Sequence, residues 1–118
     1  MALSSYPDVV ADISAHAAVL SKDIPDTMKG FSAMAKAAAG VDGALAEREK
    51  ELIAMGIAVA LRCDGCIGFH TKALVKLGVT RAEFEEMLGV TIYMGGGPSL
   101  MYAAQALRAW EEFGGAKS

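Results

Sequence analysis

Proline and glycine divide this chain into helix-length segments, and this division constrains the fold more than any other feature. Pro25 and Pro98 each open a segment at the first-turn position that proline favours in an α-helix. Gly78 stands where a helix commonly stops. The stretch "TRAE" from Thr80 is a capping box, in which a threonine and a glutamate satisfy each other's backbone amides. In a chain rich in alanine, these signals predict an all-α fold of about six helices.

We expect the helices over about residues 7–21, 25–40, 44–61, from within "CDGC" to 78, 80–95 and 98–113, with short connections between antiparallel neighbours. The longest apolar run, "LIAMGIAVAL" at 52–61, is about half of the roughly 20 residues that a bilayer span needs. It therefore predicts a helix that is buried on all sides. The final "GGAKS" suggests a disordered tail. We expect the 118 residues to form a single domain.

The composition limits the partners of the protein. Hydrophobic residues make up 53% of the chain and charged residues 21%, which is apolar for a small monomer and predicts a homo-oligomer with apolar interfaces. The net charge of −3 and the lack of a basic cluster argue against nucleic acid as a partner. The N-terminal stretch has no signal-peptide pattern and no segment predicts a membrane span, so we expect a cytoplasmic protein without a membrane partner.

The stretch "LRCDGCIGFH" at residues 61–70 carries the chemistry. It holds the only two cysteines, Cys63 and Cys66, with His70 four residues further on. On a helix these three side chains share one face. The start of a helix favours an anionic sulfur, because its free amides and its dipole both stabilise negative charge. Asp64 opposes this effect, since a carboxylate beside the thiols repels a thiolate.

Three interpretations of this motif compete. In the first, the dithiol is redox-active and closes a disulfide after one sulfur has been oxidised. In the second, it binds zinc, but the motif supplies three ligands and the other histidine, His16, lies far away in the first predicted helix. In the third, the cysteines are small buried hydrophobes beside a packed histidine. We favour redox chemistry, without a bound cofactor or metal.

Glu51 lies twelve residues before Cys63, and the pattern of Glu51, Cys63, Cys66 and His70 resembles the carboxymuconolactone decarboxylase family, in its alkylhydroperoxidase D-like branch. The resemblance covers about residues 47–113, including the stretch 78–107. It implies a small helical bundle that assembles into trimers or hexamers. It further implies that Cys66 becomes a sulfenic acid, that Cys63 closes the disulfide, and that Glu51 and His70 relay protons.

The resemblance thus implies a thiol-dependent peroxidase or disulfide oxidoreductase. Its substrate is hydrogen peroxide or a small organic hydroperoxide, and an unknown thiol or dithiol resets the pair. The peroxidase of this branch has a second histidine directly before the second cysteine, where this chain has Gly65. Two alternatives stay open. One is a non-catalytic oligomeric module that senses redox state or metal, or binds a small molecule. The other is a decarboxylase-like lyase on a small cyclic acid, although the decarboxylases of the family lack the cysteine pair.

Overall fold

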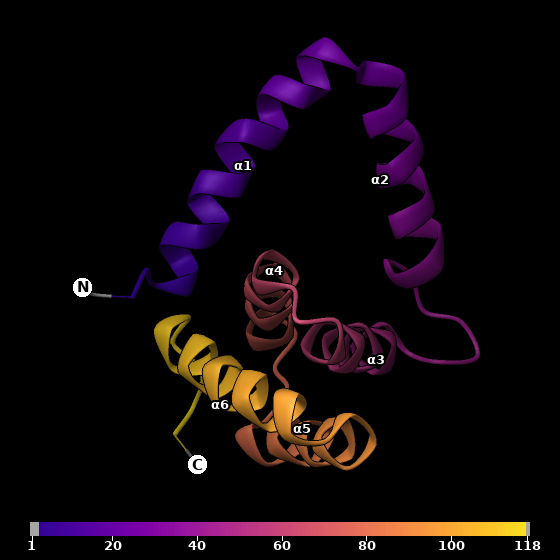
Figure 1. The fold of residues 1–118 in the computed structure, drawn as a ribbon. Coiled ribbons are helices and arrows are strands. Elements are labelled where there is room, and N and C mark those ends of the chain that lie inside the picture. The colour runs from indigo at the N-terminus through magenta and orange to yellow at the C-terminus, as the bar shows by residue number, and fades with distance from the viewer. Residues whose placement is uncertain (1–2, 118) are drawn as a thin grey trace.

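The computed structural model describes residues 3–117, which form six helices and no strand (Figure 1). This confirms the all-α prediction, with bounds that differ from the expected ones by a few residues. The helices are α1 (Tyr6–Asp23), α2 (Pro25–Ala39), α3 (Glu47–Ala60), α4 (Asp64–Lys76), α5 (Arg81–Gly95) and α6 (Gly97–Glu112). Among residues 3–117, no helix is long and apolar enough to cross a membrane.

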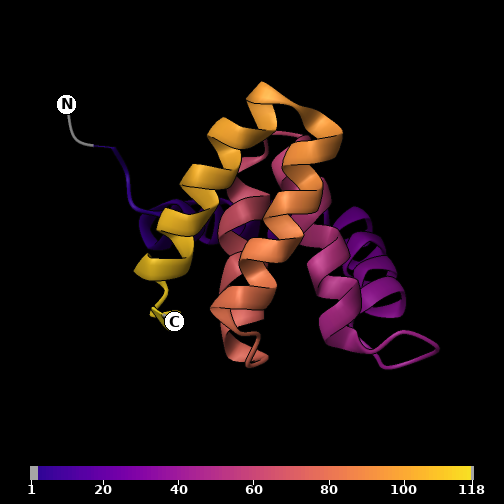
Figure 2. The ribbon, with the colours of Figure 1, turned by 90° about the horizontal axis from the view of Figure 1, so that it is seen from below.

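Helices α3 to α6 form the body of the molecule (Figure 2). Each of them contributes fully buried side chains to one core, which includes Met55, Ile67, Phe84 and Trp110. The rings of Phe84 and Trp110 lie with their centroids 4.7 Å apart and join α5 to α6. Burying such large side chains stabilises a fold by about 1.5–3 kcal/mol each, so this body is the stable part of the structure.

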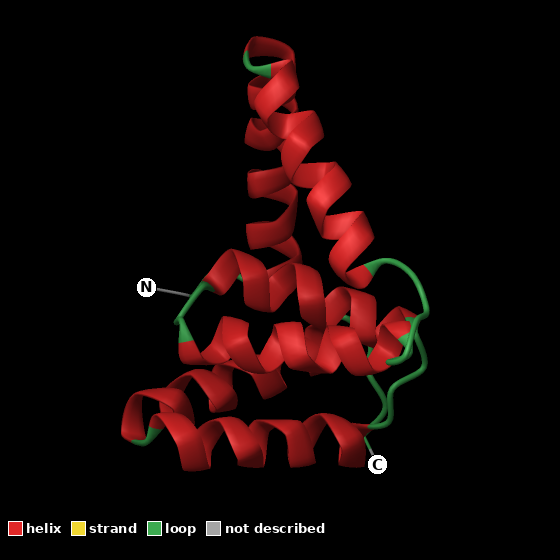
Figure 3. Cartoon of the chain, turned by 90° about the vertical axis from the view of Figure 1, so that its right-hand side faces the viewer, coloured by secondary structure: helices red, strands yellow, loops and turns green. Residues whose placement is uncertain are grey.

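Helices α1 and α2 form a hairpin that projects from the body as an arm (Figure 3). Only the first half of α1 is anchored, through the buried Tyr6 and Val10, and α2 has no buried residue. The arm exposes Ile13, Val19, Leu20, Ile24, Phe31 and Met34. Such a surface is costly for a monomer in water.

The predicted helix boundaries at Gly78 and Thr80 are confirmed. Gly78 has φ +77° and donates its amide to Val75 O at 3.2 Å, and the Val79 amide reaches Leu74 O, which closes α4 in a Schellman motif. At the start of α5, the Glu83 amide donates to Thr80 Oγ1 at 3.1 Å, and the Thr80 amide donates to Glu83 Oε1 at 2.9 Å.

The prediction that the second half of α3 is buried on all sides is wrong for the single chain. Ile53 and Ile57 are each 53% exposed, and Leu61, which follows the helix, is 72% exposed. The reason is geometric: α4, α5 and α6 pack against one side of α3, and Ile53 and Ile57 lie on the side that these three helices leave open.

The expected disorder of the tail is also wrong for residues 114–116, while residue 118 lies outside the described part. Gly114 has φ +80° and ends α6, and Trp110 Nε1 donates to Ala116 O at 2.8 Å. The indole N–H of a buried tryptophan needs an acceptor, and the tail supplies it.

Candidate active site

Cys63 and Cys66 are joined by a disulfide at the start of α4, with their Cα atoms 5.2 Å apart. This separation lies within the usual range for a disulfide. Cys63 is the N-cap residue of α4, and its Sγ accepts from the Cys66 amide at 3.1 Å. Both residues are partly exposed. The pair therefore stands at the positive end of a helix, where reagents from solvent can reach it.

The turn between α3 and α4 places the pair, and it uses an unusual residue. The Cys63 amide donates to Ala58 O and the Arg62 amide donates to Val59 O, both at 3.1 Å, which is a Schellman motif at the end of α3. Its left-handed position, normally a glycine, is occupied by Arg62 with φ +57°. Sequence reasoning missed this turn, because arginine gives no signal for a left-handed backbone.

Glu51 and His70 form a pair between α3 and α4, because α4 runs back alongside α3. His70 Nδ1 donates to Glu51 Oε1. The Glu51 side chain is only 11% exposed and that of His70 is 33% exposed. A carboxylate only accepts hydrogen bonds, so the proton of the neutral imidazole sits on Nδ1 and leaves Nε2 as the basic nitrogen. His70 lies one helical turn beyond Cys66, so the pair extends from α3 toward the disulfide.

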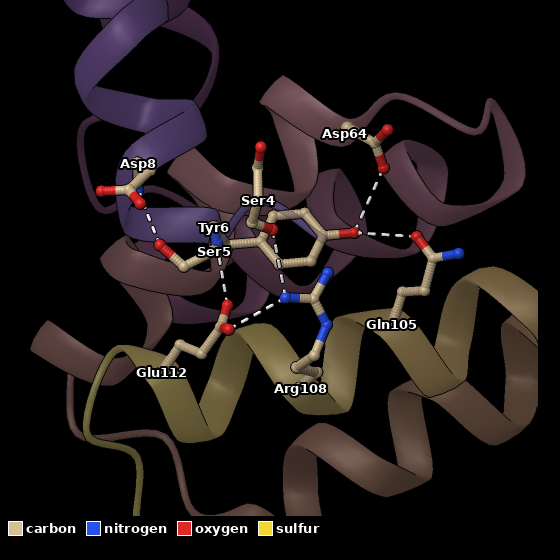
Figure 4. A network of polar contacts seen from close by, with 8 residues as sticks. All are labelled: Ser4, Ser5, Tyr6, Asp8, Asp64, Gln105, Arg108 and Glu112. Carbon is tan, nitrogen blue, oxygen red and sulfur yellow. Dashed lines mark hydrogen bonds and ion pairs between the residues drawn. The ribbon is translucent and has the colours of Figure 1, made fainter. Parts of the chain in front are cut away.

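Tyr6 joins the site from α1, and sequence analysis missed it (Figure 4). Its hydroxyl lies 3.1 Å from Asp64 Oδ1 and 3.1 Å from Gln105 Oε1, and the residue is 2% exposed. Burial, and then the charge of Asp64, raise the pKa of the Tyr6 hydroxyl far above its usual range. Tyr6 is therefore neutral at physiological pH and acts as a hydrogen-bond donor.

The backbone and ring of Tyr6 are anchored on α6. Its amide donates to Glu112 Oε1 at 2.8 Å, and the Arg108 guanidinium lies 4.9 Å from the ring centroid. Arg108 Nη1 also donates to Glu112 Oε2 at 2.9 Å and to Ser4 O at 3.2 Å (Figure 4). A tyrosine directly before a proline was the only sequence signal for this anchor, and it is a weak one.

Two glycines let α1 approach α4 closely. A Cβ atom on Gly68 would lie 2.7 Å from Val10 Cγ2, and a Cβ atom on Gly65 would lie 2.6 Å from Ile13 Cδ1. Both distances are too short for carbon atoms. The side chain of Ile13 therefore lies against the backbone of Gly65, between the two cysteines.

An apolar groove of about 400 Å³ lies between α3 and α5. It is lined by Leu52, Ile53, Gly56, Ile57, Ala60, Met87, Val90, Thr91 and Met94. At about 100° per residue, the α3 part of this lining lies on the opposite face of the helix from Glu51. The groove is therefore separate from the disulfide within one chain. Within residues 3–117, no three His, Cys, Asp or Glu side chains gather as a metal site.

The model of the carboxymuconolactone decarboxylase family matches residues 25–109, which include α3, α4 and the disulfide. The chain belongs to this family. A carboxymuconolactone decarboxylase family protein from Legionella pneumophila, solved in its apo form, is 56% identical, with a TM-score of 0.89 over 92% of this chain and 96% of its own.

Two further proteins are similar in sequence to this chain. An uncharacterized protein of Cupriavidus necator is 40% identical over 83% of this chain and 86% of its own length. An uncharacterized protein from the cox locus of Paracoccus denitrificans is 36% identical over 64% of this chain and 68% of its own length. The family match starts after α1, so Tyr6 lies outside it.

Proposed function

We propose that this carboxymuconolactone decarboxylase family protein is a thiol-dependent peroxidase or disulfide oxidoreductase. The observation that carries the proposal is the Cys63–Cys66 disulfide at the start of the helix that also holds His70, paired with the buried Glu51. The disulfide is the oxidised product that such a cycle requires. The proposed role fits the cytoplasm, where thiol reductants are available.

In the proposed cycle, the Cys66 thiolate attacks the terminal oxygen of a hydroperoxide and the O–O bond breaks. The alkoxide or hydroxide that leaves takes the proton that His70 accepted from the Cys66 thiol, and Cys66 becomes a sulfenic acid. The Cys63 thiol then attacks the Cys66 sulfur, so the disulfide forms and water leaves. An external thiol or dithiol reduces the disulfide with two electrons and two protons. Glu51 supports His70 as an ionised partner while His70 exchanges its proton.

The same site argues for modest peroxidase turnover. The histidine that precedes the second cysteine in the related peroxidase is replaced by Gly65, and the side chain of Ile13 lies over that position. Only the Glu51–His70 pair then supplies protons. Disulfide exchange with a small thiol needs less proton transfer than peroxide cleavage. We therefore expect the disulfide oxidoreductase activity of the protein to exceed its peroxidase activity.

The test compares five proteins in a coupled assay with dithiothreitol and either hydrogen peroxide or cumene hydroperoxide. We expect turnover in wild type, and loss of peroxide turnover in Cys66→Ser, Cys63→Ser and His70→Asn. His16→Asn is the matched control, since His16 is exposed on the arm. Peroxide turnover that survives Cys66→Ser would overturn the proposal. A thiol pair that reacts with neither peroxide nor disulfides would instead favour a binding module.

We further propose that a second copy of the chain covers the apolar groove. The groove has almost no polar lining, and the side chains around it are among the most exposed apolar ones: Ile53, Ile57, Val90, Tyr93 and Met94. The arm adds a second uncovered apolar surface. Interfaces between obligate subunits resemble a divided core, and both surfaces have that composition.

Light scattering after size-exclusion chromatography tests this assembly. We expect wild type to have a multiple of the chain mass, and Ile57→Glu with Val90→Glu to shift it to smaller species. Val41→Glu serves as the control, because Val41 is also apolar and exposed, at 46%, but lies in the loop before α3. A monomeric wild type would contradict this proposal.

A further inference from the structure

We propose that Tyr6 is a positioning residue for the cysteine pair: its hydroxyl holds the Asp64 carboxylate and weakens the repulsion between Asp64 and the Cys66 thiolate. This inference rests on the proposed redox function and deepens it, because it names a residue that tunes the nucleophile. The contact joins the arm to the dithiol, since Tyr6 belongs to α1 and Asp64 lies between the two cysteines.

The geometry gives Tyr6 one main acceptor. A phenol carries a single hydroxyl proton, so Tyr6 donates to one oxygen at a time although two lie at 3.1 Å. Rotation of the Gln105 amide turns its nitrogen toward the hydroxyl, which then accepts from Gln105 and donates to Asp64. Hydrogen bonds to a charged acceptor are the stronger ones, so this arrangement is favoured. Gln105 thereby orients Tyr6 toward Asp64.

Asp64 is the carboxylate that lies between the two cysteines in the sequence. It is the first residue of α4, where a carboxylate complements the helix end but repels a nearby thiolate. A donated hydrogen bond withdraws charge from the carboxylate and fixes its direction. The Tyr6 hydroxyl is therefore expected to lower the pKa of the reduced Cys66 thiol relative to a protein without it.

Several other charged groups near the site pair with each other, so they should not hide the effect of Tyr6 on the Cys66 thiol. On α6, Arg108 and Glu112 pair with each other and so contribute little net charge. On α3 and α4, Glu51 and His70 form their own pair. The other polar groups around Tyr6 are Tyr102, Gln105, Arg108 and Glu112, and the cationic Arg62 directly precedes Cys63 and is the same in every variant of the test.

The test measures the rate of Cys66 alkylation by iodoacetamide against pH in the reduced full-length protein, with the modified cysteine identified by mass spectrometry. We expect Tyr6→Phe to lower the rate at pH 7 by about twofold, which is a rise in the thiol pKa of about 0.3 units. Asp64→Asn is expected to raise the rate at pH 7 by about threefold. In the Asp64→Asn background, Tyr6→Phe should change nothing further.

The double variant separates this role from a structural one. If Tyr6 only anchors the arm, Tyr6→Phe lowers the rate by the same factor with and without Asp64, and the inference is overturned. A Tyr6→Phe rate equal to wild type also overturns it. If Tyr6→Phe does not fold, Asp64→Asn still decides, because Asp64 is exposed and an unchanged alkylation profile in that variant contradicts the inference.

The alkylation assay is independent of the proposed turnover. A protein that shows the expected pattern of alkylation rates but reduces neither peroxide nor disulfides would support the role of Tyr6 and contradict the proposed function. The converse result is peroxide turnover through Cys66 with an alkylation profile that Tyr6→Phe and Asp64→Asn leave unchanged. That result would support the proposed function and contradict the role of Tyr6.

Discussion

Glu51 and His70 lie nineteen residues apart, on helices that run back along each other, and their side chains form a half-buried hydrogen-bonded pair. The α3–α4 turn creates this contact, because it reverses the chain directly before the disulfide. A buried carboxylate is stable only with such a partner. The turn thus places Glu51 of α3 beside His70, which lies on the same helix as the disulfide, α4.

Replacement of Glu51 should therefore affect chemistry more than folding. We expect Glu51→Gln to reduce peroxide turnover by about tenfold or more, because the amide still accepts from His70 but cannot stabilise its protonated form. The measurement is initial rate at saturating reductant. Glu49→Gln is the matched control on the same helix, since its amide oxygen can still accept from the Ala46 amide. Equal rates in Glu51→Gln and Glu49→Gln would remove Glu51 from the relay.

The left-handed Arg62 should be a point of strain. We expect Arg62→Gly to stabilise the reduced protein by about 0.5–1 kcal/mol, because glycine adopts a φ of +57° without a steric penalty. Urea denaturation of the reduced protein measures the change. Arg62→Ala should show no gain, since it keeps the penalty. A stabilised Arg62→Ala would mean that the arginine side chain, not the backbone, is unfavourable.

The close contact between α1 and α4 should tolerate no side chain at Gly68. We expect Gly68→Ala to destabilise the protein by about 1–2 kcal/mol, because its Cβ would lie 2.7 Å from Val10 Cγ2. The same change at Gly89, in α5 with no atom within 4 Å of the added Cβ, should stabilise by about 0.5–1 kcal/mol. Thermal unfolding of the Gly68→Ala and Gly89→Ala variants measures both changes in stability. An unchanged stability of Gly68→Ala would show that α1 moves away from α4 without a measurable cost.

Glu83 should make the protein sensitive to acid. A hydrogen bond from the Thr80 backbone, and then Arg48, lower the pKa of Glu83 from 4.5 to about 2. The stability from this group is complete above the unfolded pKa and is lost as pH falls toward the folded one. We expect Glu83→Gln to reduce the fall in the urea midpoint between pH 5 and pH 2. Glu86→Gln, on the exposed face of α5, should leave that fall as in wild type.

Local signals in the sequence predicted the helices well. Gly78, Thr80 and Pro98 mark boundaries through short-range hydrogen bonds and fixed dihedral angles, which a linear sequence contains. The start of α4 within the cysteine motif followed from the same reasoning. The burial of α3 did not, because an apolar segment does not show whether its own chain or a second copy covers it.

The contacts that α1 makes with the site were not predictable from the sequence. Tyr6 is 58 residues from Asp64, and neither residue carries a pattern that points to the other. The close approach of α1 depends on Gly65 and Gly68, whose missing side chains are visible only when the neighbouring helix is in place. Arg62 was missed for a different reason: its backbone has a positive φ, which is typical of glycine and is not expected for arginine.

The most direct test of the account asks which sulfur peroxide oxidises. Reduced Cys63→Ser and Cys66→Ser proteins are treated with one equivalent of hydrogen peroxide in the presence of dimedone, and the adduct is measured by intact mass spectrometry. We predict an adduct on Cys66 in Cys63→Ser and little or none on Cys63 in Cys66→Ser. An adduct that forms faster on Cys63, or on neither cysteine, would contradict the assignment of Cys66 as the nucleophile.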